Sequence, residues 1–137
     1  MVVKSRVRAV ITYQAKLLLV QHQGYNTWCL PGGGIEAGEG LKDALKRELF
    51  EELGVHADIG KLLVVHQFKE DGYYQGPEFF FEVTNPHDFV QLDIRNTSHG
   101  QAEIAKAEFK DPSQTENIRP SFLNQLLHQQ DMLVVLE

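Results

Sequence analysis

One stretch of this chain, residues 33–55, constrains the fold more than any other part. It reads GGIEAGEGLKDALKRELFEELGV. Within it, a leucine recurs at every fourth position from Leu41 to Leu53, which predicts a helix over about residues 41–53 with one apolar stripe. Gly54 follows the last leucine, and a glycine at this position commonly ends a helix. The stretch therefore predicts one amphipathic helix with a defined end.

Three glutamates lie on this predicted helix beside the leucines. Glu48, Glu51 and Glu52 are spaced i, i+3 and i+4, so they fall within a sector of roughly 100°. Like charges at this spacing destabilise a helix by roughly a few tenths of a kcal/mol per pair, and crowding raises the pKa of each carboxyl group. A divalent cation removes that penalty, and an all-oxygen ligand set favours Mg²⁺ or Mn²⁺ over Zn²⁺. The alternative is an acidic, solvated helix face that binds nothing.

A glycine-rich segment, WCLPGGG at residues 28–34, lies just upstream of this helix. Glycine lets the backbone approach a ligand closely, so such a segment can bring N–H and C=O groups near a phosphate or a metal ion. No Gly-Lys-Ser/Thr sequence follows, so the segment is not a P-loop. We expect Gly32, Gly33 and Gly34 to contact the substrate, with a plain turn as the alternative.

The whole stretch fits the pattern GX5EX7REUXEEXGU, in which U is a bulky aliphatic residue, at every fixed position. Seven positions require one residue type each, so a chance match at a given start has a probability of about one in a hundred million. The chain resembles the Nudix hydrolases, which are MutT-like enzymes acting on nucleoside diphosphates linked to another moiety. The resemblance implies an α/β protein with the Nudix fold, an α/β/α sandwich with a mixed β-sheet flanked by helices.

The resemblance also implies roles for individual residues. The expected catalytic residues are Arg47, Glu48, Glu51, Glu52 and Glu39. Among them, the three glutamates of the helix match the metal ligands of the family, together with the carbonyl group of Gly32. Arg47 matches an arginine that orients one glutamate, and Glu39 is its expected ion-pair partner. The general base is left open, because it is one of these glutamates in some relatives and a residue on a later loop in others.

Composition narrows the range of functions. With 137 residues the chain is expected to form a single domain, residues 1–137. A net charge of −6 disfavours binding to long DNA or RNA, which rewards a basic surface. Cys29 is the only cysteine, so no internal disulfide or cysteine-based zinc site is expected. Charges interrupt every apolar run near the N-terminus, so we expect no signal peptide, no membrane span and, by default, a cytoplasmic protein.

The pattern of apolar and polar residues predicts the remaining elements. Strands are expected at residues 6–13, 16–21, 61–68, 78–83 and 107–110. Turns are expected at 14–15 and 70–72. Residues 84–103 are polar and irregular, which predicts a flexible loop over the active site. Residues 120–129 are expected to be helical, and residues 132–136 to form either a last strand or a dimer contact.

Three residues outside residues 33–55, the stretch that fits the pattern and that we call the box, are candidates for substrate binding. Arg6 and Arg8 share one face of the first predicted strand, where they either meet substrate phosphates or form a surface pair. Tyr73 follows the box at a spacing near that at which some relatives stack a tyrosine on a base. The alternative for Tyr73 is plain packing beside a turn.

Five further residues have both a functional and a structural interpretation. Glu78, Asp93 and Glu103 either supply another ligand or base, or are solvated carboxylates. His66 either lines the pocket or is a hydrogen-bonded core histidine. Trp28 either stacks on a base or packs under the glycine-rich segment.

These observations predict hydrolysis, dependent on Mg²⁺ or Mn²⁺, of the pyrophosphate linkage in a nucleoside diphosphate linked to another moiety. Expected substrates are a nucleoside triphosphate, a dinucleoside polyphosphate or a nucleotide sugar. ADP-ribose is disfavoured, because residues 56–71 lack the proline that often follows the box in ADP-ribose pyrophosphatases. The expected partner is a small nucleotide, without long nucleic acid or membrane, and the resemblance adds a homodimer as an expectation. The alternatives are a nucleotide-sensing binding module with little turnover and an RNA 5′-end pyrophosphohydrolase.

Overall fold

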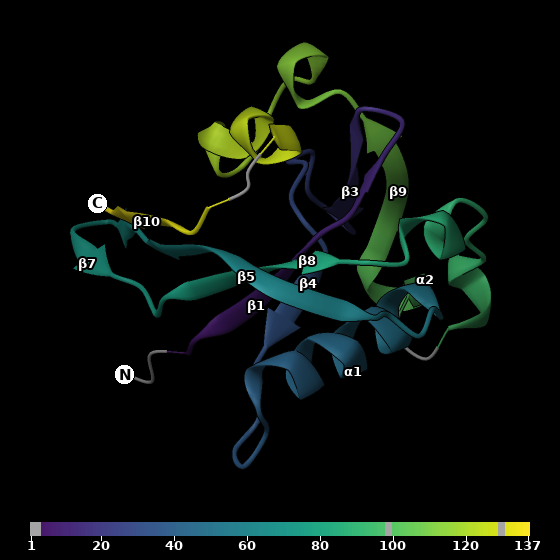
Figure 1. Ribbon diagram of the computed structural model, residues 1–137, viewed down its shortest axis with the longest axis horizontal. Coiled ribbons are helices and arrows are strands. Elements are labelled where there is room, and N and C mark those ends of the chain that lie inside the picture. The colour runs from purple at the N-terminus through teal and green to yellow at the C-terminus, as the bar shows by residue number, and fades with distance from the viewer. Residues whose placement is uncertain (1–3, 98–99, 129–130) are drawn as a thin grey trace.

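The computed structural model describes residues 4–97, 100–128 and 131–137. The strands of its central sheet are β1 (Arg6–Val10), β4 (Gly32–Gly34), β5 (Ile59–Gln67), β8 (Glu78–Val83) and β10 (Leu133–Leu136). Their order in the sheet is β10-β5-β8-β1-β4 (Figure 1). The β1–β8 and β5–β10 pairs are parallel, whereas the β5–β8 and β1–β4 pairs are antiparallel, so the sheet is mixed as predicted.

A second, antiparallel sheet stands beside the first. Its strands, in spatial order, are β2 (Thr12–Tyr13), β3 (Lys16–His22) and β9 (Ile104–Lys110). The strand predicted at 107–110 is the end of the longer β9. A small hairpin of β6 (Lys69–Glu70) and β7 (Tyr73–Tyr74) follows β5, and its turn at Asp71 and Gly72 has positive φ at both residues, as a tight hairpin turn requires.

The first predicted strand, residues 6–13, is interrupted in the structure. It divides into β1, in the central sheet, and β2, in the second sheet. The reason is a change of partner: β1 lies parallel to β8, whereas β2 pairs with β3 across the predicted turn at 14–15. Both halves have the residue composition of a strand, so composition alone does not reveal the change of sheet.

The two faces of the central sheet pack against different helices. On one face, Val7 and Phe81 pack with the leucines of α1 (Leu41–Leu53), which begins and ends as predicted. On the other face, Phe80 packs against η4 (Ser121–His128), a 3-10 helix. Figure 1 shows α1 and η4 on opposite sides of the sheet. The molecule is therefore the sandwich that the sequence predicted.

The prediction that residues 84–103 are irregular is wrong for the described part of that segment, whereas its flexibility stays a prediction. It contains two 3-10 helices and a short α-helix: η1 (Pro86–Phe89), η2 (Ile94–Asn96) and α2 (Gly100–Glu103). Phe89 is buried in the core next to α1. The hydroxyl group of Thr97 donates to the backbone carbonyl of Glu52 at 3.2 Å. The segment is thus attached to the C-terminal end of α1 by contacts that are distant in sequence and carry no periodic pattern.

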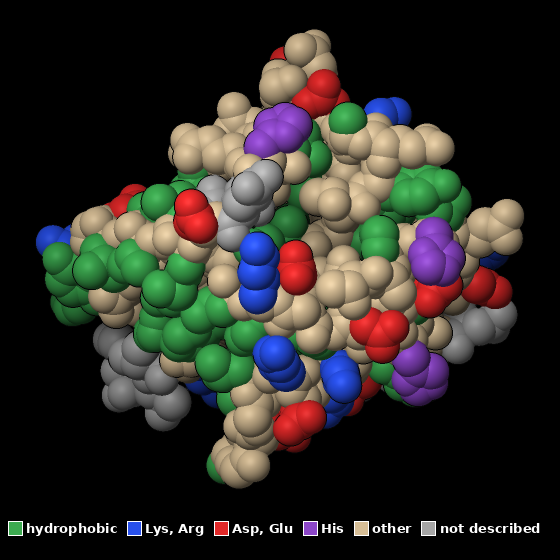
Figure 2. All heavy atoms as spheres, viewed as in Figure 1, with side chains coloured by type: hydrophobic (Ala, Val, Ile, Leu, Met, Phe, Trp, Pro, Cys, Tyr) green, Lys and Arg blue, Asp and Glu red, His purple; other side chains and the backbone are tan. Residues whose placement is uncertain are grey.

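The C-terminal segment agrees with the sequence where it is described. The helix expected at 120–129 is η4, although residue 129 lies outside the described residues. Residues 132–136 contain β10, which confirms the strand alternative and makes it an edge of the central sheet. Val134 and Leu136 are exposed on this edge, and Figure 2 shows hydrophobic side chains gathered over the end of the sheet that carries β7 and β10. The homodimer stays a prediction.

No helix within the described ranges is long and apolar enough to cross a membrane.

Candidate active site

The site begins where the glycine-rich segment passes between β1 and α1. Gly32, Gly33 and Gly34 form the short edge strand β4, paired with β1, rather than an open loop. Gly32 has φ +146°, and a Cβ there would overlap the backbone carbonyl of Val7. A Cβ on Gly33 would lie 2.5 Å from the carboxylate of Glu48. Glycine is therefore needed at Gly32, where the backbone of β1 approaches closely, whereas a side chain at Gly33 would displace the carboxylate of Glu48.

Arg47 lies among the carboxylates of Glu39, Glu48 and Glu51. Its Nε is 2.7 Å from Oε2 of Glu39, and an N–H of the same guanidinium donates to Oε1 of Glu39 at 2.9 Å. The other terminal nitrogen, Nη1, lies 3.1 Å from Glu48 and 3.2 Å from Glu51, while Nη2, which faces Glu39, also donates to the Gly34 carbonyl at 3.0 Å. The predicted Arg47–Glu39 ion pair is thus confirmed. The Arg47 guanidinium also lowers the pKa of Glu39 to about 2.

Glu52 differs from its neighbours because it is almost completely buried. It is 2% exposed, and its Oε2 atom has no hydrogen-bond partner among the residues that the structure describes. Burial, together with the nearby charge of Glu48, raises the pKa of Glu52 to about 8. Burial also raises the pKa of Glu48. A buried carboxylate oxygen without a partner costs free energy, so this position calls for a positively charged ligand.

These side chains open into a cavity of about 570 Å³. It is lined by Arg6, Arg8, His22, Cys29, Gly32, Gly33, Gly34, Glu36, Arg47, Glu48, Glu51, Glu52 and Glu103. We call it the carboxylate cavity. It brings together all the predicted site residues except Glu39, which lies behind Arg47, and Tyr73. Glu103 reaches it from the end of α2, whereas Asp93 lines a separate surface depression.

The donor atoms of the carboxylate cavity fit a hard divalent cation. The candidate ligands are carboxylate and carbonyl oxygens, which Mg²⁺ and Mn²⁺ prefer. In the described parts of the chain, no three acidic, histidine or cysteine side chains are grouped so that they could hold a metal ion together, and Arg47 pairs with two of the glutamates. Mg²⁺ usually takes only one or two protein carboxylates and completes its shell with water and substrate phosphates. Glu52, with its unpartnered oxygen, and the adjacent Glu48 suffice for that role.

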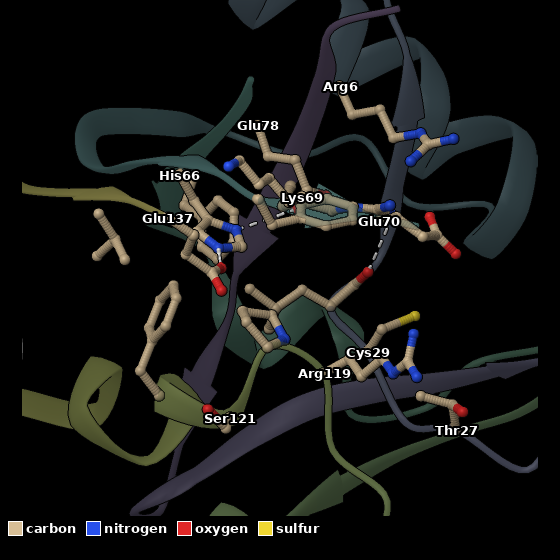
Figure 3. A pocket seen from close by; sticks show the side chains of 17 residues that line it. Arg6, Thr27, Cys29, His66, Lys69, Glu70, Glu78, Arg119, Ser121 and Glu137 are labelled. Atoms are coloured by element: carbon tan, nitrogen blue, oxygen red, sulfur yellow. Dashed lines mark hydrogen bonds and ion pairs between the residues drawn. The ribbon is translucent and has the colours of Figure 1, made fainter. Parts of the chain in front are cut away.

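A second cavity, of about 690 Å³, lies between the central sheet and η4. Its walls include the rings of Phe68, Phe80 and Phe122, so we call it the aromatic cavity (Figure 3). The two cavities are adjacent, because Arg6, Arg8 and Cys29 line both. An extended ligand can therefore occupy the aromatic cavity at one end and the carboxylate cavity at the other.

A chain of polar contacts crosses the aromatic cavity. Arg8 Nε lies 2.9 Å from Oε2 of Glu78, and Oε1 of Glu78 lies 3.3 Å from Nδ1 of His66. Nε2 of His66 lies 2.6 Å from Oε2 of Glu137, and Figure 3 shows that ring and carboxylate pointing toward each other. His66 is therefore both a hydrogen-bonded core histidine and part of the cavity wall. Strand alternation predicts that Glu78 and Phe80 share a face, but no pattern in the sequence indicates Glu137 or Phe122.

Two aromatic candidates lie outside both cavities. Tyr73 is 63% exposed, because the turn at Asp71 and Gly72 directs the hairpin into solvent. It does not line either cavity, so the expected stacking position is not where the structure places it. Trp28 is buried in the core on the η4 side, with the Lys110 ammonium 4.7 Å from its ring centre, which confirms the packing interpretation.

The fold and the carboxylate cavity together define the class of protein. The chain belongs to the NUDIX domain family, whose pattern matches residues 3–126. It is similar to the RNA pyrophosphohydrolase of Psychrobacter arcticus, with 33% identity over 111 residues that cover 70% of this chain and 60% of the relative. It is also similar to the CTP pyrophosphohydrolase of Escherichia coli, with 37% identity over 70 residues that cover 48% of this chain and 52% of that protein.

The chain thus spans between about half and 60% of the lengths of these curated relatives. Among solved structures, a UDP-X diphosphatase superposes with a TM-score of 0.74 at 24% identity, covering 98% of this chain and 68% of the other. That likeness shows that the fold is shared.

Proposed function

We propose that this protein hydrolyses the pyrophosphate linkage of a nucleoside diphosphate joined to another moiety, with Mg²⁺ or Mn²⁺ as cofactor. The observation that carries the proposal is the buried, unpartnered carboxylate oxygen of Glu52. It faces a cavity that is also lined by Arg6, Arg8 and Arg47 and is adjacent to an aromatic cavity. The cation, the phosphates and an aromatic base would then each have a complementary surface in two adjacent cavities.

Different residues of the chain would bind the cation and orient its ligands. Glu48, Glu51, Glu52 and the Gly32 carbonyl would hold the cation. When bound, the cation neutralises phosphate charge and lowers the pKa of a water molecule. Arg47 orients the glutamates through its contacts with Glu48 and Glu51, and Glu39 fixes Arg47 in turn. Catalysis then comes mainly from positioning and charge neutralisation.

The reaction itself breaks one phosphorus–oxygen bond. Water attacks one phosphorus of the diphosphate and loses a proton to a carboxylate, and the bridging oxygen leaves with the other phosphoryl group. A nucleoside triphosphate would give a nucleoside monophosphate and pyrophosphate. Arg8 and Arg6, which border the carboxylate cavity, would bind the phosphates, and the rings of the aromatic cavity would contact the base.

A second candidate is removal of pyrophosphate from RNA 5′ ends. The similarity to an RNA pyrophosphohydrolase favours it, and a 5′ triphosphate presents the same phosphates as a free nucleotide. The net charge of −6 favours the small substrate, because a long RNA brings many further negative charges. Cytoplasmic location and a homodimer remain predictions.

The test is a substrate panel assayed with Mg²⁺, with Mn²⁺ and with EDTA. The panel contains the four nucleoside triphosphates, a dinucleoside polyphosphate, UDP-glucose, ADP-ribose and a 5′-triphosphorylated RNA. We expect cation-dependent release of a nucleoside monophosphate from at least one small substrate, and weak competition by the RNA. Tight nucleotide binding without turnover would instead indicate a binding module, and preferential hydrolysis of the RNA would establish the second candidate.

A further inference from the structure

The wall between the two cavities contains Arg8, whose orientation is set from the aromatic side. Its Nε donates to Oε2 of Glu78 at 2.9 Å, and one terminal N–H donates to the Leu30 carbonyl at 3.4 Å. A guanidinium has five N–H donors in a rigid planar fork, so these two bonds fix the plane of the whole group. The rest of the group borders both cavities.

Glu78 is itself held in place. Its side chain is only 9% exposed, and its second carboxylate oxygen lies 3.3 Å from His66. The His66 ring is 3% exposed and stacks on Phe68 with 5.6 Å between ring centres, while Phe122 meets it edge-on at 5.1 Å. A carboxylate has little freedom to rotate when each of its oxygens has a polar partner and aromatic rings pack around it.

Stability alone does not account for this buried ion pair. Replacing a buried pair by well-packed apolar side chains is often neutral or stabilising, because both charges lose their hydration. A fixed guanidinium, in contrast, is what planar recognition of a phosphate requires. We infer that Glu78 is a positioning residue, which holds Arg8 in the orientation that binds the substrate phosphates. The inference rests on the proposed function, since it takes the substrate to carry phosphates.

The inference is tested with a double-mutant cycle on Arg8 and Glu78. The four proteins are the wild type, Arg8→Gln, Glu78→Gln and the double variant, each assayed for KM and kcat with ATP and CTP in Mg²⁺. We expect Glu78→Gln to raise KM roughly tenfold, as for a loss of one charge-assisted contact, and to change kcat less than about threefold. In the Arg8→Gln background the same substitution should change KM less than about twofold, because its effect passes through Arg8.

Two results would overturn the inference. One is an equal increase in KM in both backgrounds, which would mean that Glu78 acts on the substrate directly or through the fold. The other is that Glu78→Gln lowers kcat without a change in KM. The matched control is Glu82→Gln, which removes the same charge four residues along the same face of β8. Glu82 accepts from the backbone N–H of Lys61 at 3.3 Å and lines neither cavity, so this variant should retain the wild-type KM.

The same proteins separate this inference from the proposed function. If the wild type binds nucleotides without hydrolysing them, the proposed function fails, and the cycle is measured on the dissociation constant by calorimetry with the same expected coupling. If hydrolysis is found and the substitutions are additive, only the positioning role fails. If the wild type neither binds nor hydrolyses any nucleotide of the panel, both fail.

Discussion

The two cavities are built in opposite ways. In the carboxylate cavity, the groups of the box come from one continuous stretch, Gly32 to Glu52, in which β4 leads into α1. In the aromatic cavity, the contacts join distant segments: Arg8 and Glu78 are 70 residues apart, and His66 and Glu137 are 71 apart. The candidate cation ligands are thus placed by one local motif. The residues that line the aromatic cavity are brought together by the topology of the sheet.

The two cavities also differ in how their charges are balanced. In the aromatic cavity, Glu78 has a cation, Arg8, within hydrogen-bond distance. In and beside the carboxylate cavity, Arg47 pairs with four glutamates, whereas Glu52 is left with a buried oxygen that lacks a partner among the described residues. An unpaired buried carboxylate such as Glu52 therefore indicates a site for a cation. A paired one such as Glu78 indicates a residue that fixes the orientation of its partner. Substitutions in each cavity test these two inferences.

The largest expected effect follows from removing the charge of Glu52. Glu52→Gln keeps the size of the side chain but removes a candidate cation ligand, so turnover should fall by about 10²–10⁴-fold, as for the loss of a catalytic acid–base group. The measurement is the steady-state rate of nucleoside monophosphate release in Mg²⁺. In EDTA above pH 8 the variant should unfold at a temperature no lower than the wild type, because the buried charge that Glu52 then carries has been removed.

The control for this prediction is Glu108→Gln, on the exposed part of β9. It removes one negative charge away from both cavities and should leave turnover unchanged. Near-wild-type turnover in Glu52→Gln would show that the unpartnered oxygen has no part in the reaction.

The pH dependence of stability should report the same group. Folding raises the pKa of Glu52 from its ordinary value of 4.5 to about 8, so the folded state binds this proton more tightly than the unfolded state. In EDTA the free energy of unfolding should therefore be highest below about pH 4.5 and decrease as the pH rises through 8. Chemical denaturation at pH 5 and pH 8 measures the decrease, which should be smaller in Glu52→Gln. An equal decrease in both proteins would assign it to other groups.

A substitution in β4 tests the geometry on which the carboxylate cavity depends. Gly32→Ala should lower the free energy of unfolding by about 1–3 kcal/mol, because its φ is positive and the new Cβ would overlap the Val7 carbonyl. The matched control is Gly34→Ala, since a Cβ there meets no atom within 4 Å. Urea denaturation of the two variants gives the comparison. Equal stabilities would mean that β4 can move away from β1 without cost.

The contrast between local and long-range contacts also explains which features could be predicted from the sequence. The helix Leu41–Leu53 and the grouping of the glutamates follow from local spacing, and both are present. The Arg47–Glu39 ion pair, which is also present, follows from the resemblance to the Nudix hydrolases. Glu137 and Phe122 could not be predicted to meet His66, because only strand order and the path of η4 bring them there. The helices within residues 84–103 were missed for a related reason: they are stabilised by tertiary contacts with α1 rather than by a periodic pattern of their own.

The smallest expected effect concerns Tyr73, which local spacing suggested as a stacking residue. Its side chain is exposed on β7 and lines neither cavity, so Tyr73→Ala should change KM for nucleotides less than about twofold and the free energy of unfolding by about 0.5 kcal/mol or less. Phe122→Ala is the positive comparison, because Phe122 forms part of the aromatic wall and its loss should raise KM. If Tyr73→Ala raises KM as much as Phe122→Ala does, the hairpin must fold over the bound substrate. Recognition would then depend on a local segment as well as on the topology of the sheet.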